Sequence, residues 1–227
     1  MSCLVVVGCG RIAFDPRSGD SGSQFPDALQ SRDGSTANIS FGEQPGATYM
    51  GVTRDTFIRA SDPANNYGSD DTLEIGPSRS SVIRFDLSML PPTSTISAAE
   101  LRITVEFGGL SGAAEMFRVL EDWNEGSEIA MPGVANYTMR TAALPWSNAG
   151  AQGPTSRAAS PSASFLPSQV DTTYFVSLDR LVVQSWVADP ATNFGITIES
   201  SSSGACDFGS QGNAVPERRP VLFLTIP

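Results

Sequence analysis

Two clusters of oxygen-bearing side chains are the first places in this sequence where chemistry could occur. The first lies in the turn-rich segment 62–71 and consists of Asp62, Asn65, Asn66, Asp70 and Asp71. Carboxylate and amide oxygens at short spacing are the ligands that a hard cation such as Ca²⁺ requires. The same residue types dominate ordinary turns, and the spacing does not match an EF-hand loop. An ordinary turn is the favoured reading, and a structural Ca²⁺ site held by these five residues is the alternative.

The second cluster surrounds Trp123 and contains Glu121, Asp122, Glu125 and Glu128. Two carboxylates across a cleft could act as acid and base in glycoside cleavage. The alternative is a structural corner, in which Trp123 is buried and the acids accept hydrogen bonds from loop amides or hold a cation. The sequence shows no other feature that indicates a cleft or a substrate-binding site. The structural role is therefore favoured, and a glycan hydrolase or lyase is the least favoured function.

Aromatic and arginine side chains in predicted loops are the candidate ligand contacts. Aromatic rings can stack on the apolar face of a sugar, and guanidinium groups can donate hydrogen bonds to its hydroxyl or carboxylate groups. The candidate contacts are Tyr67, Tyr137, Trp146, Arg59, Arg84 and Arg140. The alternative is that the loop aromatics plug the ends of a hydrophobic core, where Trp123 and Trp186 are also expected.

The three cysteines cannot form a disulfide framework. Cys9 follows the short apolar run 4–8, which resembles a bacterial lipobox and indicates lipidation of Cys9. The match is partial, because no positive charge precedes Cys9 and the apolar run is short for a signal peptide. The alternative is an ordinary buried N-terminal strand. Cys206 is expected to be an inert, buried thiol, because a catalytic thiol needs an activating base and the chain has no histidine.

Charge and composition limit the classes of partner. The net charge of -10 and the isoelectric point near 4.4 exclude nucleic acid, because a polyanion would be repelled. They favour divalent cations and neutral or cationic glycans. The absence of histidine weakens every enzyme hypothesis, so the protein is expected not to be an enzyme. The sequence contains no apolar run of transmembrane length, so the only expected membrane contact is a lipid anchor at Cys9.

The elements that position these residues are predicted from short alternating runs separated by Gly and Pro. Strands are expected at 52–59, 72–75, 81–87, 98–107, 116–120, 194–199 and 220–226. In the clearest run, Leu101, Ile103, Val105 and Phe107 are predicted to face inward. The Gly-, Pro-, Ser- and Ala-rich segment 127–169 is predicted to be a long loop, which is typical of functional or disordered segments.

One short helix is predicted near residues 178–187. Leu178, Leu181, Val182 and Trp186 fall at helical spacing. Ser177 is placed to cap the start of this helix, and Asp189-Pro190 is placed to end it. With 227 residues, the chain is expected to form one core. The predicted organisation has three parts. Residues 1–9 are a truncated lipoprotein signal, residues 10–46 are a flexible tether, and residues 47–227 are an all-β domain. Within the tether, an edge strand is expected around residues 39–41.

Several segments resemble, in order, the DNRLRE domain, a jelly-roll module related to disaggregatase repeats and also classed among carbohydrate-binding modules. They are Asp55-Thr56-Phe57-Ile58, Asn66-Tyr67-Gly68, the run 81–88 followed by Leu90-Pro91, the run 96–101, the corner 121–125, Tyr137, Trp146, Trp186, Asn193-Phe194-Gly195-Ile196 and Arg219-Pro220-Val221-Leu222. The resemblance implies a jelly-roll β-sandwich displayed outside the cell, sometimes binding anionic glycans such as alginate. The net charge of -10 does not suit an anionic ligand such as alginate, unless calcium bridges the negative charges of protein and glycan.

These observations predict a secreted or cell-envelope protein with a non-catalytic role. The favoured function is a surface module, stabilised by Ca²⁺, that binds a polysaccharide or another matrix component through loops at one end or through a concave sheet face. The alternative is a structural, lipid-anchored envelope protein whose partner is another surface protein.

Overall fold

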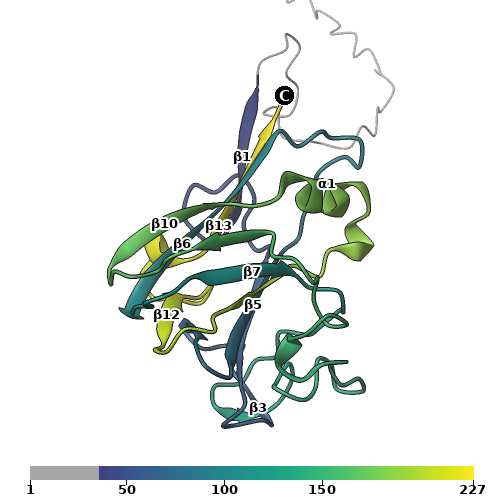
Figure 1. Cartoon of the computed structure of the whole chain (residues 1–227). Helices are drawn as coiled ribbons and strands as arrows, with labels where there is room; N and C mark the ends of the chain where they lie inside the picture. Colours follow the sequence, from purple (N-terminus) through teal and green to yellow (C-terminus); the bar gives the residue numbers. More distant parts are fainter. Residues whose placement is uncertain (1–35) are drawn as a thin grey trace, which may run out of the picture. The chain divides into compact units, whose positions relative to one another are not determined.

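The alternating runs form two antiparallel sheets in a computed structural model that describes residues 36–227 (Figure 1). Sheet A has the strand order β1 (Ala37–Gly42), β13 (Val221–Ile226), β6 (Ala98–Gly108), β12 (Cys206–Gly209) and β4 (Thr72–Ile75), with β10 (Thr172–Ser177) also paired to β6. Sheet B has the order β2 (Thr53–Arg59), β5 (Arg79–Phe85), β11 (Ile196–Glu199), β7 (Ala114–Arg118) and β9 (Ala163–Phe165). The short strands β3 (Asn65–Asn66) and β8 (Met131–Pro132) pair with each other.

The main hydrophobic core lies between the two sheets. Leu101 and Ile103 of β6 and Ile83 of β5 are fully buried there. The rings of Phe165 in β9 and Phe208 in β12, one from each sheet, lie with their centroids 6.0 Å apart. This packing confirms the predicted all-β sandwich.

The predicted inward position of Phe107 is wrong. Phe107 is 69% exposed, although Leu101, Ile103 and Val105 in the same strand are fully buried. The pairing of β12 with β6 shifts register between Asp207 and Phe208, which is a β-bulge. Because a bulge adds one residue to a strand, the side chains beyond it change faces.

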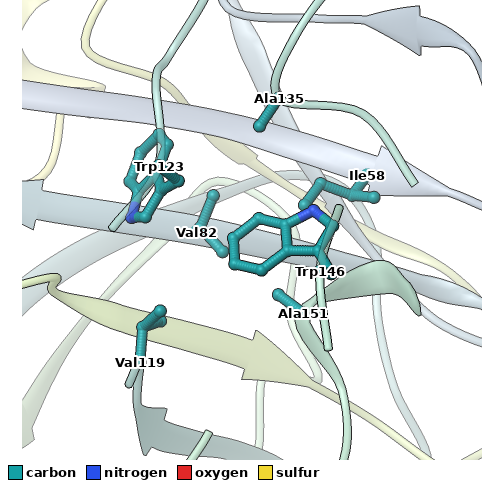
Figure 2. Close-up of a cluster of buried hydrophobic side chains, with 7 residues drawn as sticks. All are labelled: Ile58, Val82, Val119, Trp123, Ala135, Trp146 and Ala151. Carbon is teal, nitrogen blue, oxygen red and sulfur yellow. The ribbon is translucent and has the colours of Figure 1, made fainter. Parts of the chain in front are cut away.

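Sheet B has a second hydrophobic core on its other face, built against the segment predicted as a long loop. Within this segment the chain forms β8, a 3₁₀ turn η2 (Ala149–Ala151) and β9. The cluster consists of Ile58, Val82, Val119, Trp123, Ala135, Trp146 and Ala151 (Figure 2). Val82 and Ile83 are consecutive in β5 and both fully buried, because both faces of sheet B are covered.

The predicted helix is α1 (Arg180–Ala188). Its cap is not Ser177 but Asp179, whose carboxylate accepts a hydrogen bond from the Leu181 backbone N–H at 2.9 Å. Leu181 is 61% exposed, and Val183, Trp186 and Val187 form the buried side of the helix. Ser177 instead ends β10, because pairing with β6 extends to that residue. The helix ends at Ala188, directly before the predicted stop Asp189-Pro190, and Pro190 begins the 3₁₀ turn η3 (Pro190–Thr192).

Residues 1–35, which include the predicted lipidation site Cys9 and most of the predicted tether, lie outside the described part of the chain. Residues 37–42 form β1, which pairs with β13 along its whole length. Among residues 36–227, no helix is long and apolar enough to cross a membrane.

Candidate functional site

The outer face of sheet A carries a surface hollow. Because side chains alternate along a strand, Glu100 and Arg102 of β6 point away from the core that buries Leu101. The register places Phe175 of β10 opposite Arg102, and Phe223 of β13 opposite Glu100. Two phenylalanine side chains therefore flank the central strand on this face.

A hollow of about 330 Å³ lies at this position. We call it the sheet A hollow, and its lining residues are Asn38, Ala98, Glu100, Phe175, Phe223 and Thr225. Phe175 is 59% exposed, whereas Phe223 is partly buried. The strands that supply these residues, β1, β13, β6 and β10, are neighbours in the sheet (Figure 1).

The polar groups of the sheet A hollow keep much of their hydrogen-bonding capacity. The Thr225 hydroxyl donates to Asn38 Oδ1 at 2.9 Å, which leaves the Asn38 amide N–H groups available. The Glu100 carboxylate makes no hydrogen bond or ion pair with any residue of 36–227. The neighbouring Arg102 is engaged, because it donates to the Gln44 side chain and to the Glu217 carbonyl.

The arrangement matches what a sugar chain needs from a protein surface. An aromatic ring can stack on the apolar face of a sugar, while amide and carboxylate groups bond its hydroxyls. From strand spacing and rise per residue, the Cα atoms of Phe175 and Phe223 are about 12 Å apart. Two rings at this separation can contact different sugars of one chain.

A family model for carbohydrate-binding module family 96 matches residues 46–226. The chain belongs to carbohydrate-binding module family 96. Among curated proteins, no sequence matches this chain. The match covers most of the chain and identifies the protein as a carbohydrate-binding module whose partner is a carbohydrate.

The loop aromatics that the sequence indicated as ligand contacts of the module are turned inward. Tyr67 is 3% exposed and stacks on Phe57, with ring centroids 4.0 Å apart. Trp146 is 4% exposed and donates from Nε1 to the Asn136 carbonyl at 2.9 Å. Tyr137 is partly buried and packs against the second core. The Tyr67 and Trp146 rings present no open face to a ligand, because they fill the ends and the second core of the sandwich.

The three arginines indicated as ligand contacts are occupied by the module itself. Arg59 forms ion pairs with Asp62 and Glu74. Arg140 donates to the backbone carbonyls of Pro145 and Asp122 and forms an ion pair with Glu121. Arg84 lies over the Trp123 ring, with its guanidinium carbon 5.3 Å from the centroid, and bonds to the Asp122 carboxylate at 2.7 Å. Arg84 also lines a surface hollow of about 190 Å³ on the sheet B side.

The five residues predicted to bind calcium already act as hydrogen-bonding partners within the module. Asn66 is fully buried; its amide donates to the carbonyls of Glu125 and Ala135, and its oxygen accepts from two backbone N–H groups. Asp70 caps the start of β4 by accepting from Thr72. The Asp62 carboxylate pairs with Arg59, the Asn65 amide donates to the Ala130 carbonyl, and the Asp71 backbone carbonyl accepts from Asn213. Calcium binding at this segment stays a prediction.

The acidic corner has the structural arrangement that the sequence favoured. Glu121 accepts hydrogen bonds from Ser147 and Ser156. Burial raises the pKa of Glu121, but these hydrogen bonds and the nearby Arg140 outweigh it and lower the pKa overall. Glu125 accepts from the Asp55 backbone N–H at 2.8 Å and from the Gln211 amide, and burial raises its pKa. Both carboxylates stabilise loops around Trp123, whose Nε1 donates to the Phe194 carbonyl at 2.9 Å.

The residues of the sheet A hollow were missed by sequence reasoning. No strand was predicted at residues 172–177, so Phe175 was not among the predicted ligand contacts. Phe223 and Glu100 lie in predicted strands, where alternation could have placed them on the outer face. That signal could not show whether another part of the chain covers this face.

Proposed function

We propose that this module binds a neutral or cationic polysaccharide at the sheet A hollow, without catalysing its cleavage, as part of a protein displayed outside the cell. The observation that carries the proposal is the exposed Phe175 ring beside Phe223, in one hollow with the available groups of Asn38 and Glu100. Surface display rests on the partial lipobox ending at Cys9 and on the resemblance to surface domains.

The charge of the protein supports the choice of glycan. The net charge is -10, and Glu100 adds an unpaired carboxylate within the hollow. An anionic polysaccharide would be repelled by both. A neutral sugar chain pays no such cost, and its hydroxyl groups can bond to Asn38 and Thr225.

A non-catalytic role is supported by the state of the candidate acids. Glycoside cleavage needs two carboxylates that face a substrate across a cleft. Glu121 instead accepts hydrogen bonds from Ser147 and Ser156, and Glu125 accepts one from the Asp55 backbone N–H. Cys206 is fully buried, and burial raises the pKa of its thiol to about 12, which leaves it protonated and unreactive at neutral pH.

The test compares two exposed phenylalanines. Phe175→Ala removes a ring from the hollow, and Phe107→Ala removes an exposed ring that does not line it. Binding to a panel of soluble polysaccharides is measured by affinity electrophoresis, and calorimetry follows with the ligands that bind. We expect Phe175→Ala to weaken binding about tenfold, as the loss of one stacked ring contact implies.

Phe107→Ala is expected to bind like the unaltered protein. Equal affinities for the Phe175→Ala variant and the unaltered protein would show that the glycan binds elsewhere. Absence of binding to every member of the panel would contradict the proposal itself.

A further inference from the structure

Glu100 is the one acidic residue among those that line the sheet A hollow. It lies on the central strand β6, directly opposite Phe223 of β13 on one side and Ser177 of β10 on the other. Phe175 is two residues from Ser177 on the same face of β10. The carboxylate is therefore placed between two strands that each carry a phenylalanine of the hollow.

This carboxylate differs from three others on the two sheets, which are paired with arginine. Glu74 is paired with Arg79, Glu106 with Arg218, and Glu199 with Arg157. Glu100 has no such partner within residues 36–227, and it remains partly accessible. Arg102 lies two residues along the same strand face, but its guanidinium donates to Gln44 and to the Glu217 carbonyl. The hollow thus contains an unneutralised negative charge flanked by aromatic rings.

We infer that the sheet A hollow selects polysaccharides built from amino sugars, and that Glu100 is the residue that determines this selectivity. The inference rests on the proposed function and names its substrate class. A protonated amino group can form a charge-assisted hydrogen bond with the Glu100 carboxylate. Phe223, which lies directly opposite Glu100, can also attract this cation through the negative potential of its ring face.

Other classes of sugar chain are expected to make fewer favourable contacts in this hollow. A neutral or N-acetylated chain can stack on the rings, but its contact with Glu100 carries no charge assistance. A uronic acid chain places its own carboxylates against Glu100 and against the negative surface of the module. The expected order of affinity is amino sugar chain first, neutral chain second and uronate chain last.

The experiment measures dissociation constants for three oligosaccharides of equal length, a β-1,4-linked glucosamine oligomer, its fully N-acetylated form and an oligouronate. Calorimetry is carried out in mildly acidic buffer with the whole chain and with Glu100→Gln. The matched control is Glu115→Gln, which removes the same charge from an exposed position on β7 in sheet B. Circular dichroism melting verifies that each variant is folded.

We expect the glucosamine oligomer to bind at least about tenfold more tightly than its N-acetylated form, as one charge-assisted hydrogen bond implies. Glu100→Gln should remove most of this preference, and Glu115→Gln should retain it. Added salt should weaken binding of the glucosamine oligomer more than that of the N-acetylated one.

The outcomes separate this inference from the proposed function. Binding of the neutral oligomer that depends on Phe175, without preference for the amino sugar, would overturn the inference and leave the proposed function standing. A preference that survives in Glu100→Gln would overturn the role of Glu100. Absence of binding to all three oligomers at the hollow would overturn both.

Discussion

Individual carboxylates in this module differ in how well the fold accommodates their charge. Asp207 of β12 faces Glu74 of β4 in the register of sheet A. Its Oδ1 atom is buried and has no hydrogen-bond partner within residues 36–227. Burial, followed by the negative charge of Glu74, raises the pKa of Asp207 to about 6. At neutral pH the fold therefore holds a carboxylate that it stabilises poorly.

Replacing this carboxylate should stabilise the protein. Since the folded-state pKa of Asp207 lies above its ordinary value of 3.8, the Asp207 contribution to stability is fully present below 3.8 and is lost as pH rises through about 6. We expect Asp207→Asn to raise the free energy of unfolding above that interval by about 1–2 kcal/mol, allowing for solvent screening of the partly exposed group. Urea unfolding below and above the interval measures this difference.

The same experiment contains its own control. The stability of the unaltered protein should fall between the two pH values more steeply than that of Asp207→Asn, because the variant lacks the titrating group. A variant that is less stable than the unaltered protein above the interval would show that the ionised carboxylate is needed in the fold.

At the scale of elements, the segment 127–169 covers the outer face of sheet B. It packs on sheet B through Trp146 and Ala151, whereas sheet A has an exposed hollow around Phe175 and Phe223. Its backbone is held by buried side chains such as Asn136, whose amide donates to the carbonyls of Ala64 and Gly133. The long segment therefore serves to pack on sheet B. The candidate ligand site lies on sheet A.

Trp146 should matter for stability and not for glycan binding. Trp146→Ala is expected to reduce the free energy of unfolding by about 3–5 kcal/mol, as large-to-small changes in a core do. Its control is Leu144→Ala, which changes an exposed side chain of the same segment and should alter stability by less than about 0.5 kcal/mol. Chemical unfolding and glycan titration are measured for both.

A different result would restore the interpretation drawn from the sequence. If Trp146→Ala kept its stability but lost glycan affinity, the indole would be a ligand contact and the second core would contribute little to stability.

At the scale of the whole molecule, the structural unit begins before the family match. The match starts at residue 46, whereas β1 spans Ala37–Gly42 and pairs with β13. Ile39 and Phe41 of β1 are buried in the main core. Asn38 of the same strand lines the sheet A hollow. Both the fold and the candidate site therefore depend on residues outside the matched region.

A chain that begins at residue 46 should be less stable and should bind glycans less well than one that begins at residue 36. Loss of the buried side chains of Ile39 and Phe41 alone costs about 3–6 kcal/mol. The exposed edge of β13 would also become available for pairing with other chains. Thermal melting and light scattering compare the two chains, and equal melting temperatures would show that β1 is dispensable.

The sequence by itself determined the fold class, several strands and the single helix of the described residues. Alternation in runs such as 98–105 and the Asp189-Pro190 stop carry this information locally. Charge and composition limited the partner, and the order of short motifs indicated a carbohydrate-binding module. Local patterns could not predict the outward position of Phe107, because the bulge that produces it is defined by pairing with β12.

Only the tertiary structure decided which side chains can meet a ligand. Tyr67 and Trp146 lie in irregular segments, from which the sequence allows either ligand contact or a place in the core, and the fold turns both rings inward. Phe175 and Phe223 lie in strands, yet both line a hollow on the outer face of sheet A. An aromatic ring is buried or exposed according to what packs over its sheet face, and that covering comes from residues distant in sequence. Periodicity gives the face on which a side chain lies, and only the packed structure shows whether that face is covered.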